Sequence, residues 1–142
     1  MADTPGAHIG LNEPQIGLTV PELWAQLLVN TIGFRQAELL ATNGAVVGPA
    51  EAKRVGLVDL VVPAGKEAGL VGTAETVLQE WLKLPSLGRS LTKLAIRKPL
   101  ADKLRDVEVL NKQVDAGWVF LSNPNTIKVM KATLDRLQGS KL

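Results

Sequence analysis

The stretch Ile9-Gly-Leu-Asn-Glu-Pro-Gln-Ile-Gly-Leu-Thr-Val-Pro21 determines how the rest of this chain is interpreted. It holds one carboxylate, Glu13, among apolar residues and among residues that bend the chain, which are Gly10, Pro14, Gly17 and Pro21. Apolar surroundings keep water away from a carboxylate, and a poorly solvated carboxylate in a bent loop suits general-base chemistry. The structural alternative is an ordinary glutamate on a surface loop beside a turn, and composition alone favours that alternative.

A second informative stretch is Pro49-Ala-Glu-Ala-Lys-Arg-Val-Gly-Leu-Val-Asp-Leu-Val-Val-Pro63. Together with the Glu13 loop it resembles the enoyl-CoA hydratase/isomerase (crotonase) superfamily, nearest to its mitochondrial Δ3,Δ2-isomerase branch. The resemblance covers nearly the whole chain but only about the C-terminal half of the family domain. Because Met1-Ala-Asp3 resembles the end of an internal family strand, we expect the chain to begin in the middle of that domain.

The resemblance implies an α/β, crotonase-like fold, of which this chain is the predominantly helical C-terminal part. Residues 1–63 would then close the spiral of strand-strand-helix units and carry the Glu13 loop, and residues 64–142 would form the helical region. Terminal helices of this family commonly form trimers and cover the acyl pocket. We therefore expect a trimer, with the last two helices packed partly on a neighbouring subunit and with Trp118 and Phe120 beside the acyl pocket.

Local features of the sequence predict where the helices and strands lie. Glycine tolerates the left-handed backbone that ends a helix, and proline suits a first helical turn. The sequence predicts extended runs over 7–11, which includes His8, over 46–47 and over 57–62. It predicts helices from Pro21 to Gly33, over 34–42 and from Pro49 to Gly56. Apolar residues at helical spacing predict further helices, with stripes over 70–81, 87–94 and 104–121 and a last helix from Asn123-Pro124.

Composition narrows the function classes. The chain has 142 residues, with 46% hydrophobic and 21% charged residues and a net charge of +2, which is too small to argue for a nucleic-acid partner. A mild basic cluster near Lys98 reads as a solvated helix face, although it would also suit the phosphates of an acyl-CoA. The absence of cysteine excludes disulfides and thiolate metal sites, and a lone histidine cannot complete a zinc site. No apolar stretch reaches the ~18 residues that predict a membrane span. We expect no metal.

The resemblance also implies the chemistry. Enzymes of this family bind an acyl-CoA thioester and stabilise an enolate with two backbone N–H groups. Glu13 matches the family glutamate in the pattern Leu-Asn-Glu-x-Gln-x-Gly, which takes a proton from C2 and delivers one to C4. Asn12, Ile16 and Gly17 would contact the substrate. The chain would then serve unsaturated fatty-acid β-oxidation in the mitochondrial matrix, with no cofactor apart from the CoA of its substrate.

Two alternatives accompany this interpretation. Hydratases of the superfamily use two glutamates and a glycine-rich turn, whereas residues 4–7 hold no carboxylate and Gly17 to Trp24 is similar to the isomerase pattern. Pro14 departs from the isomerase pattern, in which a polar residue commonly follows the glutamate. The second alternative is a non-catalytic helical module that associates with full-length subunits. The resemblance places the oxyanion donors and most of the CoA pocket in the other half of the domain, so we expect this chain to be inactive alone.

Overall fold

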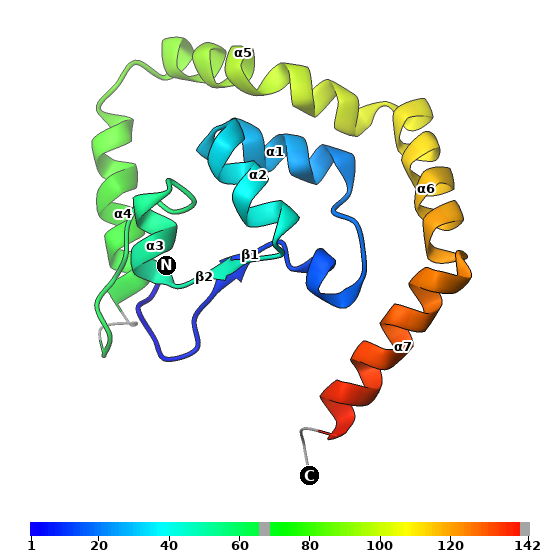
Figure 1. The fold of residues 1–142 in the computed structure, drawn as a ribbon. Helices are drawn as coiled ribbons and strands as arrows, with labels where there is room; N and C mark the ends of the chain where they lie inside the picture. The colour runs from blue at the N-terminus through cyan, green and yellow to red at the C-terminus, as the bar shows by residue number, and fades with distance from the viewer. Residues whose placement is uncertain (66–68, 140–142) are drawn as a thin grey trace. The chain divides into compact units, whose positions relative to one another are not determined.

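The computed structural model describes residues 1–65 and 69–139, and helices make up most of this part (Figure 1). The predicted helical region, 64–142, therefore contains residues 66–68 and 140–142 that lie outside the description. In chain order the elements are β1 (Ile9–Gly10), the 3-10 helix η1 (Glu13–Ile16), α1 (Glu22–Ile32), α2 (Phe34–Thr42), β2 (Val46–Val47), α3 (Pro49–Arg54), α4 (Gly69–Leu82), α5 (Ser86–Arg105), α6 (Val107–Leu121) and α7 (Pro124–Gly139).

The chain divides into two compact units, which we describe separately. The first unit comprises residues 1–9 and 47–102. Its α3 begins at Pro49 and is followed by Gly56, whose φ of 84° is the left-handed backbone expected after a helix end. Ala52 and Val55 of this segment are buried, as is Val62 farther along. The short helix predicted from Pro49 to Gly56 is confirmed.

The strand predicted over 57–62 is wrong except at its end. Ala2 and Val62 form a single parallel bridge. Val62 N–H donates to the Met1 carbonyl at 2.9 Å, and Asp3 N–H donates to the Val62 carbonyl at 2.8 Å. An extended segment becomes a strand only where a neighbour supplies hydrogen bonds along its length. In the described part of the chain, residues 1–3 supply them only at Leu60 and Val62.

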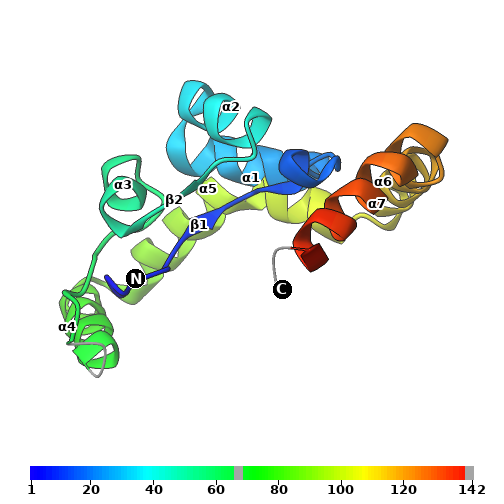
Figure 2. The same ribbon diagram turned by 60° about the horizontal axis from the view of Figure 1, so that its bottom comes forward.

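The second unit comprises residues 10–46 and 103–142, and α1 and α2 are packed side by side within it (Figures 1 and 2). Gly33, with a φ of 79°, separates the two helices, as predicted. Leu23 and Ala37 are each only 2% exposed, so they form the centre of this helix pair. Pro21 lies just before the first helical residue rather than inside the first turn.

The short strands β1 and β2 pair with each other, which confirms the extended runs over 7–11 and 46–47 in shortened form. His8 is exposed, lies just before β1 and contacts the Gly6 carbonyl at 2.9 Å, so its prediction as a strand residue is wrong. Gly10 is required by close backbone approach. A Cβ atom there would lie 2.4 Å from the Ala45 carbonyl oxygen.

The helix predicted over 104–121 is wrong at its start, because Asp106 divides it. Leu104 belongs to α5, and α6 begins at Val107. The Asp106 carboxylate accepts the backbone N–H groups of Glu108 at 2.9 Å and Val109 at 3.2 Å. It therefore satisfies two of the four donors that a helix start leaves unpaired.

The last helix follows its predicted start signal. Asn123 Oδ1 accepts the Asn125 N–H at 2.9 Å, and Pro124 is the first residue of α7. Preceding α6, the helix α5 runs through Pro99 to Arg105, well beyond the stripe predicted over 87–94.

Large apolar side chains remain exposed on α5 and α6. Leu87 and Ile96 of α5 are 72% and 73% exposed, and Trp118 and Val119 of α6 are each 71% exposed. Isolated exposed apolar residues are common, but so many on two consecutive helices indicate faces that are covered by another part of a protein.

Candidate functional site

Glu13 is the first residue of a single 3-10 turn. The turn closes when the Gln15 N–H donates to the Asn12 carbonyl at 3.0 Å, and the Leu18 N–H then donates to the Glu13 carbonyl at 2.9 Å. Pro14 lies at the second position of this helix, where its missing N–H costs no helical hydrogen bond. Gly17 ends the turn with φ 77° and ψ 20°, a left-handed conformation that glycine adopts without strain.

Two glycines fix this turn against its neighbours in the same unit. A Cβ atom on Gly17 would lie 2.4 Å from Cγ1 and 3.1 Å from Cβ of Val129, on α7. A Cβ atom on Gly44, after α2, would lie 2.8 Å from Cγ of Gln15. Because both approaches are closer than side chains permit, glycine at these two positions allows the Glu13 turn to pack closely against α7 and the end of α2.

The turn borders a cavity of about 770 Å³. One wall is the Glu13 loop with the residues that lead into α1, and the other is α6. Its main apolar residues are Leu18, Val20, Val109, Val114, Phe120 and Leu121. Its side chains with polar or charged groups are Glu13, Thr19, Glu22, Lys112 and Gln113. This volume lies within the ~300–1,000 Å³ typical of small-molecule sites.

Two polar atoms in this cavity lining are buried without a partner. Within residues 1–65 and 69–139, neither Oε2 of Glu13 nor Nε2 of Gln113 makes a hydrogen bond. An unpaired buried polar group costs ~1–3 kcal/mol, so such groups are uncommon and often mark functional sites. The cavity thus combines apolar walls with one free acceptor and one free donor, which is the composition expected of a site that orients an apolar ligand.

The other predicted residues shape the turn and do not line the cavity. Asn12 is exposed and contributes its backbone carbonyl, Ile16 is half-buried at the end of η1, and Gly17 provides the left-handed cap. Their predicted contacts with a substrate stay predictions. Phe120 lies in the cavity lining, whereas Trp118 does not belong to that lining.

Gln113 is the residue that the sequence analysis missed. It follows Val109 by four residues and precedes Phe120 by seven, so all three share a helix face, and all line the cavity. The detectable signal was a polar residue on an otherwise apolar helical row. Such a residue normally marks the edge of a solvated face, and only the fold shows that its amide is buried.

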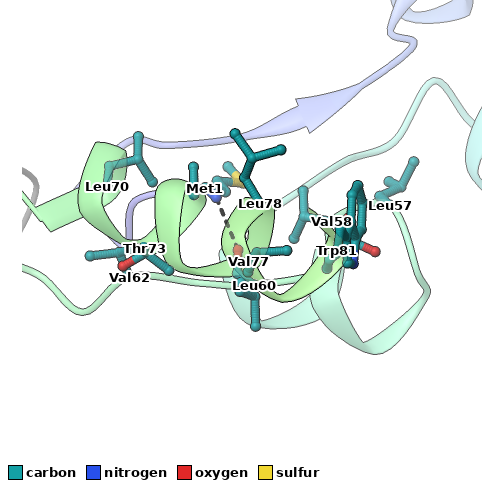
Figure 3. Close-up of a pocket in the computed structure, with 12 residues that line it drawn as sticks. Met1, Leu57, Val58, Leu60, Val62, Leu70, Thr73, Val77, Leu78 and Trp81 are labelled. Carbon is teal, nitrogen blue, oxygen red and sulfur yellow. Dashed lines mark hydrogen bonds between the residues drawn. The ribbon is translucent and has the colours of Figure 1, made fainter. Parts of the chain in front are cut away.

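The first unit has a cavity of its own, about 480 Å³, between residues 57–62 and α4 (Figure 3). Leu70, Val77, Leu78 and Trp81 of α4 face Leu57, Val58 and Leu60 across it, and the Met1 ammonium donates to the Leu60 carbonyl at 2.9 Å. Among the described residues that line it, the only carboxylate is that of the exposed Asp59. Within the described lining it therefore offers an apolar surface and no buried, unpaired side-chain group for chemistry.

The described residues form neither a cluster of metal-binding side chains nor a helix that could span a membrane. No three His, Cys, Asp or Glu side chains gather there in a group that could hold a metal ion. None of the helices in residues 1–65 and 69–139 combines the length and the apolar character needed to cross a bilayer.

The chain is similar in sequence to known proteins. The family model for enoyl-CoA hydratase/isomerase matches residues 1–120. The chain is 38% identical over 141 residues to mitochondrial enoyl-CoA delta isomerase 1 of Mus musculus, across 99% of this chain and 47% of that protein. The Homo sapiens protein of that name is 38% identical over 144 residues, across 99% of this chain and 45% of its own length.

Solved structures agree with the sequence relatives. The crystal structure of human mitochondrial delta3-delta2-enoyl-CoA isomerase matches with a TM-score of 0.85 and 37% identity, over 100% of this chain and 53% of that one. An enoyl-CoA hydratase structure from Mycobacterium avium subsp. paratuberculosis K-10 matches with a TM-score of 0.70 and 25% identity, over 95% of this chain and 52% of that one. The crotonase-like fold is confirmed, and the chain spans about half the length of the relatives that it matches.

Proposed function

This chain belongs to the enoyl-CoA hydratase/isomerase family, and on that premise we propose that it is the glutamate-bearing part of a Δ3,Δ2-enoyl-CoA isomerase. The observation that carries the proposal is the Glu13 carboxylate, which presents an unpaired oxygen to a large apolar cavity. The identity to mitochondrial delta isomerases supports the same reaction and, by resemblance, a mitochondrial location. The substrate is then an acyl-CoA thioester, and CoA enters only as part of it.

The reaction moves a double bond from the 3 to the 2 position. One proton leaves C2, the electron pair spreads over a dienolate, and one proton joins C4, so atoms and charge balance. A single carboxylate can serve as base and then as acid when it lies over the C2–C4 face. Glu13 suits this role because a free oxygen is available and because the apolar lining, including Leu18 and Phe120, keeps water from the intermediate.

A carboxylate alone is insufficient for turnover. The enolate oxygen also needs donors, and removal of one such donor typically lowers the rate ~100- to 1,000-fold. By the resemblance, those donors and most CoA contacts belong to the part of the relatives that this chain does not cover. We therefore propose that the 142-residue chain by itself turns over 3-enoyl-CoA negligibly, although it holds the proton shuttle.

Two assays test the function. The first joins this chain to the complementary half of a related isomerase and follows conjugated product from 3-enoyl-CoA, with Glu13→Gln as the variant. Because Gln keeps the shape and removes the base, kcat should fall about 100-fold or more. Retention of more than about a tenth of kcat would exclude Glu13 as the base. The second assay uses the chain alone, where turnover at ~1 per second or faster would contradict our assignment of the donors.

Two alternative functions are each supported by an observation. The match to a hydratase structure keeps an enoyl-CoA hydratase-like activity as an alternative, and hydration of 2-enoyl-CoA by the joined protein would identify it. The exposed apolar faces of α5 and α6 favour an oligomerisation role, including the trimer that the resemblance implies. Subunit assembly and catalysis are compatible, so only the assays above decide whether the chain is non-catalytic.

A further inference from the structure

The dipeptide Asn43-Gly44 at the end of α2 is suited to a covalent change of its own. The chain has six asparagines, and Asn43 is the one that glycine follows. Glycine has no side chain to shield its backbone nitrogen, so that nitrogen is open to the amide group of the preceding asparagine. The other five asparagines precede bulkier residues, which are Glu13, Thr31, Lys112, Pro124 and Thr126.

The change is deamidation through a cyclic imide. The backbone nitrogen of Gly44 loses its proton to base and attacks Cγ of Asn43. The new N–C bond forms, the bond from Cγ to Nδ2 breaks, and ammonia leaves. Water then opens the imide at either of its two carbonyls, which gives an aspartate on the ordinary main chain or a β-linked residue whose main chain runs through Cβ and Cγ. The net reaction consumes one water and releases one ammonia, without an oxidant or a reductant.

The fold slows this reaction because it holds both reacting groups. Nδ2 of Asn43 donates to the Leu39 carbonyl at 2.7 Å, and the Gly44 N–H donates to the Ala41 carbonyl at 3.1 Å. The attack requires both hydrogen bonds to break, which is an opening of the last turn of α2 alone. Helix ends open at a small cost in free energy. Asn43 is exposed, so water and base reach it when the turn opens.

The β-linked product does not fit the contacts around this turn. Gly44 is buried, and one added Cβ atom there would lie 2.8 Å from Cγ and 3.0 Å from the backbone nitrogen of Gln15, in η1. On the side of α2, the Ala45 N–H donates to the Leu40 carbonyl at 2.8 Å. The main chain is therefore held against both η1 and α2. An extra main-chain carbon next to Gly44 has to break one of these contacts.

We propose that Asn43 is a site of spontaneous deamidation and that its β-linked product releases the end of α2 from η1. The inference goes beyond the proposed function and does not rest on it, because it uses only the sequence Asn43-Gly44 and contacts within the second unit. A chain that has aged in this way carries one more negative charge. Its η1 turn, which contains Glu13, has lost close packing on one side.

The first test locates the reaction. The full 142-residue chain is kept at mildly alkaline pH, once folded and once unfolded in urea, and peptide mapping with mass spectrometry detects each amide that has become an acid. We expect acid at position 43 before any other asparagine, about 10- to 100-fold more slowly in the folded chain. Asn43→Gln is the matched control, because its amide can close only a larger ring, and position 43 should stay unmodified over the same period.

Two results of this first test would overturn the proposal. One is faster conversion at another asparagine. The other is a rate at Asn43 in the folded chain more than about 1,000-fold below the rate in the unfolded chain, because α2 would then hold its last turn far more firmly than a helix end does.

The second test concerns the product. Asn43→Asp places the same acid on the ordinary main chain, so it separates the added charge from the altered linkage. We expect the β-linked fraction of the aged wild type, isolated by chromatography, to unfold at a lower urea midpoint than Asn43→Asp, because only the altered linkage displaces Gly44. Equal midpoints would overturn the release of α2 from η1. Neither test involves turnover, so a failure here is distinguishable from a failure of the isomerase assay.

Discussion

Replacing Gly17 by alanine should destabilise the second unit through two separable costs. The first is the left-handed backbone, φ 77°, which costs a non-glycine residue ~1–2 kcal/mol. The second is overpacking, typically ~1–3 kcal/mol, because the new Cβ would lie 2.4 Å from Cγ1 of Val129. Rotation of Val129 cannot remove the strain, since its own Cβ lies only 3.1 Å away. The free energy of unfolding should therefore fall by ~2–5 kcal/mol.

Gly6→Ala is the control for the backbone cost. Gly6 has a φ of 80°, and a Cβ atom there meets nothing within 4 Å. Urea unfolding of both variants, followed by circular dichroism, gives the difference, which should be ~1–3 kcal/mol in favour of Gly6→Ala. Adding Val129→Ala should recover part of the loss in Gly17→Ala, because it removes the 2.4 Å contact and leaves the 3.1 Å one. Equal losses in the two glycine variants would refute the packing of η1 against α7.

Three further predictions concern other parts of the chain. Asp106→Ala should lower stability by ~1 kcal/mol through loss of the α6 cap, while Asp106→Asn should be nearly neutral in the same urea assay. A hydrogen bond from Arg54, together with the charge of Arg54, holds the pKa of the Glu51 carboxyl below its ordinary value. The pair therefore stabilises the folded chain at pH values above ~4.3, the pKa of a glutamate in the unfolded chain. Arg54→Met should therefore be slightly less stable than the wild type at pH 7 and should converge with it as the pH falls below that value, most clearly at low salt. Finally, the purified chain should self-associate or bind a hydrophobic dye strongly, and a sharp monomer peak in sedimentation with a cooperative melt would contradict the covered-face interpretation of α5 and α6.

The elements that the sequence predicted well are those with local stop and start signals. Gly33 and Gly56 end or separate helices because their positive φ values exclude most other residues, and Asn123-Pro124 begins α7 by capping. These effects act within a few residues, so no knowledge of the fold is needed. The same holds for Gly17, whose left-handed backbone closes the Glu13 turn.

The elements that were mispredicted depend on partners or on competing local signals. Residues 57–62 have the composition of a strand, but a strand also needs a second segment that forms hydrogen bonds along it. Sequence composition does not reveal how long that second segment is. Over 104–121 the apolar spacing continues past Asp106 and conceals the cap. The cavity itself joins the Glu13 loop to α6, about a hundred residues later, and only the fold shows that Gln113 shares it.

The apolar cavity of the first unit has a practical consequence for chemical labelling. Because the sequence contains no cysteine, a thiol introduced at Thr73, which lines this cavity, would be the single site for a maleimide dye. A dye coupled there would report on occupancy of the cavity, whereas a dye intended as a silent tag belongs on an exposed residue such as Lys128 of α7.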